Sequence, residues 1–249
     1  MIVLKSEREL EIMRKAGAIT AKILHEVAEA VRPGIRTLDL DILASELATK
    51  YGAKAAFKGY HGYPASICVS VDEEVVHGIP GERVLREGQL VSLDFGVLYN
   101  GYYGDSAITV PVGEVSDEAK RLIEVTRTAL EKGIEQAVVG RRLSDISHAI
   151  QTYVEANGFA VVRDYVGHGI GRQMHEAPPV PNFGLPDRGP RLKEGMTLAI
   201  EPMVNVSTWE VEVLADGWTV VTKDRSLSAH FEHTVAILDG GPEILTLME

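Results

Sequence analysis

The sequence holds one cysteine, Cys68, in 249 residues. A single cysteine excludes an internal disulfide and any zinc site of the CxxC type. The apolar stretches are short and interrupted, and none approaches the ~18 to 20 residues that a membrane-spanning helix requires. The first residues lack the basic and apolar regions of a secretory signal peptide. We therefore expect a cytoplasmic protein that does not bind membranes.

Positive charge is also scarce. Lys and Arg number 25 against 36 Asp and Glu, which gives a formal net charge of −11. Sequence-independent binding to nucleic acids relies on basic patches, so direct nucleic-acid binding is not expected. The hydrophobic fraction of 45% is ordinary for a globular protein with a buried core. Some of the acidic residues lie inside apolar runs, where they do not serve solubility.

Capping signals and helical periodicity predict four amphipathic helices. Ser6 and Glu9 have the spacing of a capping box, and apolar residues follow at helical intervals until Pro33-Gly34 ends the pattern. The other three helices are expected over 39–50, over 116–134 opened by Ser116, and over 144–154 opened by Ser144-Asp145. Each half of the chain thus begins with two helices and then becomes strand-like.

The two halves also repeat each other in sequence. Residues 34–40 parallel 140–146, and residues 85–88 parallel 192–195. Extending the second match aligns Asp94 with Glu201. A repeat of this length is too long for a solenoid and indicates two related α+β halves whose strands pack together with helices outside. We expect one domain over 1–249, with halves of about 1–112 and 113–249 and a site between them.

A β-hairpin is predicted in the first half. Residues 90–99 read as a buried strand, Asn100-Gly101 is the strongest short signal for a two-residue turn, and the return strand follows from Tyr102. Without a bulge, Tyr99 pairs with Tyr102.

That register places two acids on one face of the hairpin. Asp94 falls opposite Ala107, and Asp105 falls opposite Gly96. Asp94 and Asp105 are then diagonal neighbours, roughly 7 to 8 Å apart at the backbone, so their carboxylates can converge on one or two metal ions.

The second half offers a similar pair, Glu201 and Glu232, each inside an apolar run, with a further hairpin signal at Asp216-Gly217 between them. We take the four acids as repeat-related. The alternative is that they are edge-strand or ion-paired residues, but no matching cations flank these strands and an unpaired buried carboxylate costs several kcal/mol. Two divalent ions would balance the four negative charges, which favours a dinuclear site.

His168 lies in the glycine-rich stretch 165–171. The GxGxxG spacing and the following helix of a phosphate loop are both missing, so we expect the glycines to let the backbone approach a crowded site. Carboxylates with one imidazole suit Mn, Fe(II), Co or Zn.

Seven motifs together resemble the type I methionine aminopeptidases, the short bacterial form within the M24-like pita-bread peptidases. They are Gly59-Tyr-His-Gly-Tyr63, Val76-His-Gly-Ile-Pro80, Gly104-Asp-Ser106, Gly167-His-Gly-Ile-Gly171, His175-Glu-Ala-Pro178, Ile200-Glu-Pro-Met203 and Phe231-Glu-His-Thr234. The resemblance implies the pita-bread fold, with two pseudo-symmetric halves, a central antiparallel sheet and outer helix pairs. It implies hydrolytic removal of the initiator methionine from nascent proteins.

The resemblance also implies a role for each site residue. Asp105 and Glu232 would bridge two divalent ions, with Asp94 on one metal and His168 with Glu201 on the other. A metal-bridged hydroxide would attack the scissile carbonyl. His175 would donate a hydrogen bond to the oxyanion. His77 would orient the substrate amide or carry a proton, and Glu201 would accept the proton of the attacking water.

The substrate pocket implied by the resemblance contains aromatic and sulfur side chains, which suit an unbranched thioether. Besides His77 and His175 it comprises Phe57, Tyr60, His61, Tyr63, Cys68, Met174 and Trp218. Met174 stands where many relatives carry an aromatic residue, so the shape of the pocket departs from theirs. His230 and His233 flank a metal ligand but match no catalytic role.

Two other functions remain open at this point. A prolidase or Xaa-Pro aminopeptidase shares the catalytic half, but such proteins carry an additional N-terminal domain, whereas the repeat here begins by residue 6. A non-catalytic pita-bread binding protein usually loses metal ligands, whereas all five are present. The resemblance further implies a monomer that acts on nascent chains at the ribosome.

Overall fold

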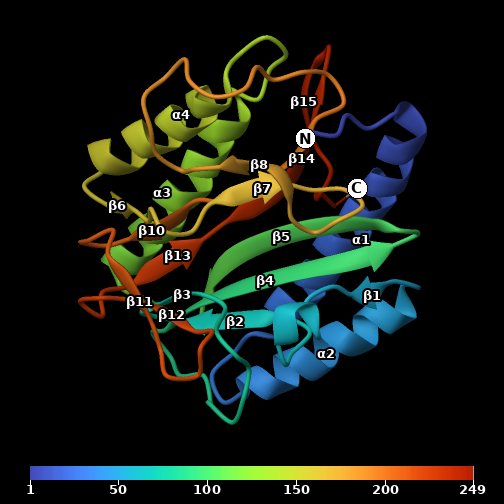
Figure 1. Cartoon of the computed structure of the whole chain (residues 1–249). Helices are drawn as coiled ribbons and strands as arrows, with labels where there is room; N and C mark the ends of the chain where they lie inside the picture. The colour runs from blue at the N-terminus through green and yellow to red at the C-terminus, as the bar shows by residue number, and fades with distance from the viewer. Residues whose placement is uncertain (249) are drawn as a thin grey trace.

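The computed structural model describes residues 1–248. Its four helices are α1 (Glu7–Ala30), α2 (Thr37–Lys50), α3 (Asp117–Ile134) and α4 (Leu143–Ala156). Helices α1 and α2 back the strands of one half, α3 and α4 back those of the other, and the two chain ends lie near each other beside α1 (Figure 1). None of the described helices combines the length and the apolar character needed to cross a bilayer.

The helix predictions are confirmed, with one error at a helix start. The capping box of Ser6 with Glu9 is present at α1, and Ser116 accepts a hydrogen bond from Ala119 N at α3. The predicted cap of α4 by Ser144 is wrong: the N-cap is Arg142, whose backbone N–H donates to Asp145 Oδ2 at 2.9 Å. Asp145 reaches back one turn because a carboxylate there satisfies the free N–H and complements the helix dipole.

The largest sheet contains nine strands, and its central path runs β1-β4-β5-β14-β9-β7-β8. These nine are β1 (Lys54–Ala55), β2 (Cys68–Val71), β4 (Leu90–Tyr99), β5 (Tyr102–Pro111), β7 (Gly167–Gly169), β8 (Glu176–Val180), β9 (Thr197–Ile200), β14 (Glu232–Leu238) and β15 (Gly241–Ile244). Two three-stranded sheets comprise β6 (Ala160–Val161), β10 (Met203–Asn205) and β13 (Ser228–His230), and β3 (Glu74–Val76), β11 (Val211–Val213) and β12 (Val220–Thr222).

The hairpin register is confirmed at every predicted pair. Tyr99 lies opposite Tyr102, Asp94 opposite Ala107, and Gly96 opposite Asp105. The turn residues Asn100 and Gly101 have φ values of 48° and 83°, as the mirror-image turns of tight hairpins require. The signal at Asp216-Gly217 also marks a hairpin, which joins β11 to β12.

The sequence repeat is visible as repeated contacts. Gly34 N donates to Leu85 O at 2.8 Å, and the repeat-related Gly140 N donates to Leu192 O at 2.9 Å. The order β4, β5, β14, β9 means that the halves meet between β5 and β14. Continuing the pairing of Ile200 with His233 by one residue brings Glu201 opposite Glu232. Asp94 and Glu201 therefore occupy equivalent positions.

The expectation that all four acids are repeat-related is wrong for the other two. Glu232 corresponds in register to Ala107, directly opposite which it lies, whereas Asp105 corresponds to His230 and lies opposite Thr234. Because Ala107 and Glu232 are equivalent positions that face each other across the junction, an acid at both would place two carboxylates directly opposite, which is unfavourable. Thr234 instead supports its neighbour: its Oγ1 accepts from Asp105 N and donates to Asp105 O.

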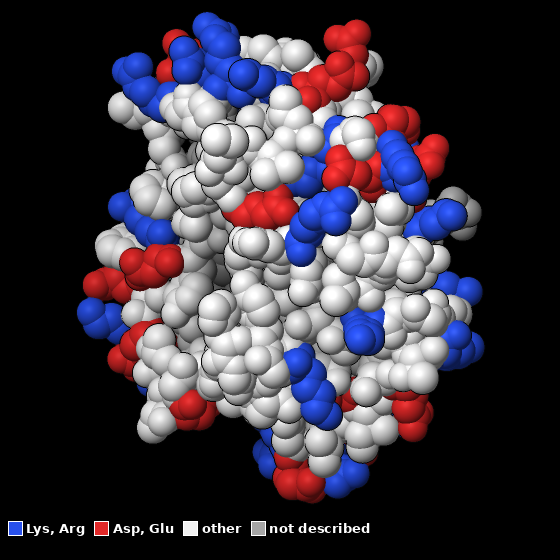
Figure 2. All heavy atoms as spheres, turned by 45° about the vertical axis from the view of Figure 1, so that its right-hand side comes forward, with Lys and Arg blue, Asp and Glu red and all other residues white. Residues whose placement is uncertain are grey.

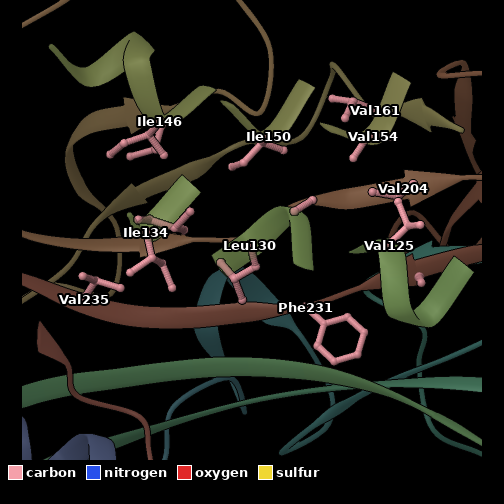
Figure 3. Packing of buried hydrophobic residues seen from close by; sticks show 14 of the residues in the cluster. Val125, Leu130, Ile134, Ile146, Ile150, Val154, Val161, Val204, Phe231 and Val235 are labelled. Atoms are coloured by element: carbon pink, nitrogen blue, oxygen red, sulfur yellow. The ribbon is translucent and has the colours of Figure 1, made fainter. Parts of the chain in front are cut away.

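Side-chain alternation separates the core from the site. Along β4, Leu93 and Phe95 pack into the cluster under α1 and α2, while Asp94 points to the opposite face. In the second half, Leu130 of α3 and Ile150 of α4 pack against strands that carry Val204 and Val235 (Figure 3). Each buried Leu or Ile contributes about 1.5 to 3 kcal/mol, so the two helix layers hold the strands that position the acids.

The excess of negative charge is distributed over the surface. On the face shown in Figure 2, basic side chains gather at the upper left, acidic and basic side chains are interspersed elsewhere, and uncharged residues cover most of the middle. The interspersed charges keep such a protein soluble without creating a field of one sign.

Candidate active site

One cavity of about 390 Å³ is lined by residues of both halves. Its lining contains all fourteen residues that the sequence analysis selected: Phe57, Tyr60, His61, Tyr63, Cys68, His77, Asp94, Asp105, His168, Met174, His175, Glu201, Trp218 and Glu232. The structure thus brings together residues separated by as much as two thirds of the chain.

Four carboxylates, those of Asp94, Asp105, Glu201 and Glu232, share this cavity without a basic partner. Within residues 1–248, the only ion-pair contacts of the four are those of Glu201 with histidines. Burial raises the pKa of Asp105 to about 7. Burial together with the neighbouring carboxylates raises the pKa of the other three well above its usual range.

These carboxylates fit divalent cations. One buried oxygen each of Asp94, Asp105 and Glu232 has no hydrogen-bond partner among the described residues. Ligand atoms of Asp105, His168 and Glu232 lie within 4.8 Å of one another. Unpartnered buried oxygens at this spacing cost free energy unless a cation binds them. A donor set of carboxylates with an imidazole suits a divalent cation.

His168 has the orientation of a metal ligand. Its Nδ1 lies 2.9 Å from Gly169 O, so the proton of the neutral ring resides on Nδ1 and the lone pair of Nε2 points into the cavity. Nε2 lies 3.5 Å from Glu201 Oε1. Burial, followed by the charge of His175, lowers the pKa of His168 to about 3, which keeps the ring neutral.

The glycines around His168 are needed for close backbone contacts. A Cβ atom on Gly167 would lie 2.3 Å from Ala199 O, and one on Gly169 would lie 2.4 Å from Ala177 O. No side chain fits at either position. The prediction that these glycines permit a crowded site is confirmed.

One contact holds the ring of His175, and a second holds the residue that follows it. The Tyr60 hydroxyl lies 2.7 Å from His175 Nδ1. When the hydroxyl donates to Nδ1, the proton of the neutral ring resides on Nε2. The next residue, Glu176, forms a buried 2.6 Å ion pair with Lys5 of the N-terminal segment. Burial, followed by the charge of His61, lowers the pKa of His175.

His77 follows β3 and enters the cavity from the first half. Its φ of 61° is rare for a side chain with a Cβ atom. The rings of Tyr165 and Trp218 meet it edge-on at 5.6 and 6.3 Å between centroids. Burial, followed by the charge of His175, lowers the pKa of His77 to about 4. His77 is therefore a neutral imidazole held in one orientation.

The apolar part of the cavity is built on a cluster that includes Phe57, Tyr63, Cys68 and Met174. Cys68 of β2 lies opposite Asp94 of β4, so this cluster adjoins the carboxylates. Trp218 reaches it from the β11–β12 hairpin and meets Tyr63 edge-on at 5.1 Å. Tyr60 is half-buried and His61 is exposed, which is consistent with a place at the entrance.

The sequence did not reveal the roles of Asp216 and His230. Asp216, expected only as a turn residue, orients Trp218, because its Oδ1 accepts from Trp218 N at 2.8 Å. His230 is 1% exposed and its Nε2 lies 3.6 Å from Glu201 Oε2. The sequence contains a signal for His230. Side chains two residues apart along a strand point to the same face, so His230 shares the face of Glu232.

Comparison with known proteins identifies the relatives of the chain. Residues 11–239 match the model of metallopeptidase family M24. A methionine aminopeptidase of Clostridium acetobutylicum is 58% identical over 250 residues, covering 100% of both chains. Methionine aminopeptidase 1 of Bacillus subtilis is 56% identical, covering 99% of both.

Comparison with solved structures agrees. The crystal structure of methionine aminopeptidase from Thermotoga maritima superimposes with a TM-score of 0.98 at 52% identity, covering 100% of both chains. The predicted pita-bread architecture is thereby confirmed. The chain belongs to metallopeptidase family M24 and, within it, to the methionine aminopeptidases of type I.

Proposed function

We propose that this chain hydrolyses the peptide bond that follows an N-terminal methionine, using two divalent cations. The observation that carries the proposal is the set of four buried carboxylates, without a basic partner within residues 1–248, beside a closed apolar cluster. Asp94, Asp105, His168, Glu201 and Glu232 are the residues that would hold the cations. When bound, these ions supply Lewis acidity for the scissile carbonyl and lower the pKa of water toward neutrality.

The side chains around the carboxylates supply the remaining groups. His175, with its proton on Nε2, is suited to donate a hydrogen bond to the carbonyl oxygen as negative charge develops there. His77, also neutral, is suited to hydrogen-bond the substrate amide or carry its proton. Glu201 lines the acidic end of the cavity, where its carboxylate is suited to accept the proton released by the attacking water.

The apolar cluster accounts for selectivity. A cavity of about 390 Å³ with an aromatic and sulfur lining fits one unbranched side chain. Cys68 opposite Asp94 connects this pocket to the acidic end of the cavity. A carboxylate beside the pocket attracts the free amine of the substrate, which restricts hydrolysis to the first residue.

The proposal includes one catalytic unit over 1–249 that acts as a monomer on nascent chains at the ribosome. Both halves are needed, since Asp94 and Asp105 come from the first and His168, Glu201 and Glu232 from the second. Light scattering on the purified protein tests the monomer, and co-sedimentation with ribosomes tests the partner.

Substrate choice is the direct test of the proposed activity. Met-Ala-Ser is expected to release methionine, because the pocket accepts an unbranched thioether. A Leu-Pro peptide, which begins with a branched side chain, is expected to remain intact. A chelator should abolish release and added Mn²⁺ should restore it. Chromatography of free amino acids measures both results.

A pair of variants sharpens this experiment. Asp105→Asn removes one proposed ligand and should abolish release, whereas Glu118→Gln, on the exposed side of α3, should leave it intact. Efficient cleavage of the Leu-Pro peptide would favour the prolidase alternative. Undiminished turnover in chelator would contradict the metal-dependent function altogether.

A further inference from the structure

His230 is a buried side chain that the proposed chemistry does not use. Its ring is 1% exposed, and neither ring nitrogen has a hydrogen-bond partner within residues 1–248. Each unpartnered buried polar atom costs about 1 to 3 kcal/mol. The backbone of His230 is held on both sides of its Cα atom, because His230 N donates to Thr109 Oγ1 and the same hydroxyl donates to His230 O.

The ring faces a proposed metal ligand. Nε2 of His230 lies 3.6 Å from Glu201 Oε2, and a second imidazole, that of His168, lies 3.5 Å from Glu201 Oε1. The carboxylate of Glu201 is therefore located between two imidazoles, one at each oxygen. Glu232 is also near, with a ligand atom within 4.8 Å of those of Glu201 and His230.

The two imidazoles differ in how they are held. A histidine that binds metal almost always donates its other ring N–H to a carbonyl, a carboxylate or water. His168 meets this condition through Gly169 O at 2.9 Å. His230 has no described carbonyl at Nδ1, so its proton is free to reside on Nε2, the nitrogen that points at Glu201.

We propose that His230 is a positioning residue that donates its Nε2–H to Glu201 Oε2 and thereby directs Oε1 toward the metal shared with His168. The inference rests on the proposed dinuclear centre. The present separation exceeds a normal hydrogen bond by roughly half an ångström, a gap that a small rotation of the Glu201 carboxylate closes. A carboxylate fixed in this way binds a cation without first losing rotational freedom.

Metal affinity is the measurement that tests this role. Titration calorimetry of the metal-free full chain with Mn²⁺ is performed on wild type and on His230→Leu, which removes the donor. The variant should bind about 10 to 100 times more weakly, the usual effect of losing an outer-shell partner.

Two amide variants test the reach of the donor. The amide nitrogen of His230→Gln takes the place of Nε2, so this variant should bind Mn²⁺ nearly as well as wild type. The shorter amide of His230→Asn takes the place of Nδ1, so it should resemble His230→Leu. If His230→Leu does not fold, the Gln and Asn pair alone decides the question.

His233 provides the matched control. It is a partly buried histidine three residues away, and its Nδ1 contacts Thr246 Oγ1 at 2.9 Å rather than a carboxylate. His233→Leu should therefore leave Mn²⁺ affinity unchanged, with circular dichroism confirming that each variant is folded.

Two results would overturn the positioning role. Wild-type affinity in both His230→Leu and His230→Asn would mean that the ring does not act on Glu201. Weak binding in His230→Gln, equal to that of His230→Leu, would mean that the imidazole is itself a ligand. The proposed peptidase activity is tested separately. Weakened Mn²⁺ binding in His230→Leu, together with no methionine release by wild type, would support the role of His230 and reject the peptidase activity.

Discussion

The metal-free protein is expected to lose stability as the pH rises from 6.5 to 8.5. Burial raises the pKa of Asp105 to about 7 from an ordinary 3.8, and the pKa of the other three carboxyl groups of the site is also raised. A group with a raised folded-state pKa contributes stability that is fully present below its unfolded pKa. That contribution is lost as the pH rises through the folded pKa.

The chosen pH window limits the opposing effect of the histidines. Burial lowers the pKa of His77 and His233 to about 4 and that of His168 and His230 to about 3. A lowered histidine pKa makes the folded state less stable below pH 6.5, where the unfolded chain takes up protons. Above pH 6.5 the unfolded chain loses its remaining imidazole protons, an opposing contribution that is complete by about pH 7.5, and from there the carboxyl groups alone determine the slope.

The expected effect is large. Each carboxyl group that stays protonated only in the folded state removes about 1.4 kcal/mol of stability per pH unit. A group that stays protonated over both units lowers the melting temperature of a chain of this length by roughly 5 to 10 °C, and Asp105, which deprotonates near pH 7, contributes less. Differential scanning calorimetry of chelator-treated, dialysed protein measures the change.

Metal binding should reverse the trend. The ligands bind cations in their deprotonated form, so the stabilisation by Mn²⁺ should grow with pH, reaching about 2.7 kcal/mol at 100 times the dissociation constant. The control is Asp105→Asn, which retains the histidines and removes one raised carboxyl group, so its metal-free profile should fall less steeply than that of wild type. A melting temperature of the metal-free protein that stays constant from pH 7.5 to 8.5 would contradict the crowding of charged carboxylates.

His175→Ala is expected to lower kcat by about 10² to 10³, the usual loss when one oxyanion donor is removed. KM should change little, because the hydrogen bond strengthens only as charge develops on the carbonyl oxygen. Metal content should equal that of wild type, since His175 Nδ1 contacts the Tyr60 hydroxyl and His175 is not among the five proposed metal ligands. Steady-state kinetics with Met-Ala-Ser and elemental analysis of the same samples check both parts.

Tyr60→Phe separates orientation from donation. It retains the aromatic ring that stacks on His175 at 5.3 Å and removes only the hydroxyl, so kcat should fall by less than in His175→Ala. His61→Ala, at the exposed entrance, serves as the comparison for a neighbouring histidine. Loss of metal in His175→Ala would make His175 a ligand and reject its assignment as oxyanion donor.

Much of the fold was predictable because its signals are local. The Asn100-Gly101 turn, with alternation in the strands beside it, determines every pair of the β4–β5 hairpin. The helix starts depend on capping chemistry within four residues, and the single error, Ser144 in place of Arg142, arose because Asp145 caps from inside the helix. The equivalence of Asp94 and Glu201 followed from the repeat.

Contacts between distant segments were not predictable from local patterns. Register across the junction of β5 and β14 depends on how the halves dock, so the true counterparts of Asp105 and Glu232, which are His230 and Ala107, were hidden. The Lys5–Glu176 ion pair, which anchors the segment of His175, joins residues 171 positions apart. Neither contact leaves a periodic trace in the sequence.

The sequence by itself determined which acids lie inside apolar strands, which two share a hairpin face and which glycines stand beside His168, because each depends on spacing along one strand or turn. Only the tertiary structure decided that these residues enclose one cavity, that the Tyr60 hydroxyl contacts His175, and that His230 faces Glu201. The reason is physical: side-chain alternation along a strand determines to which face of the sheet a residue points, whereas the docking of the two halves determines which residues contact that face.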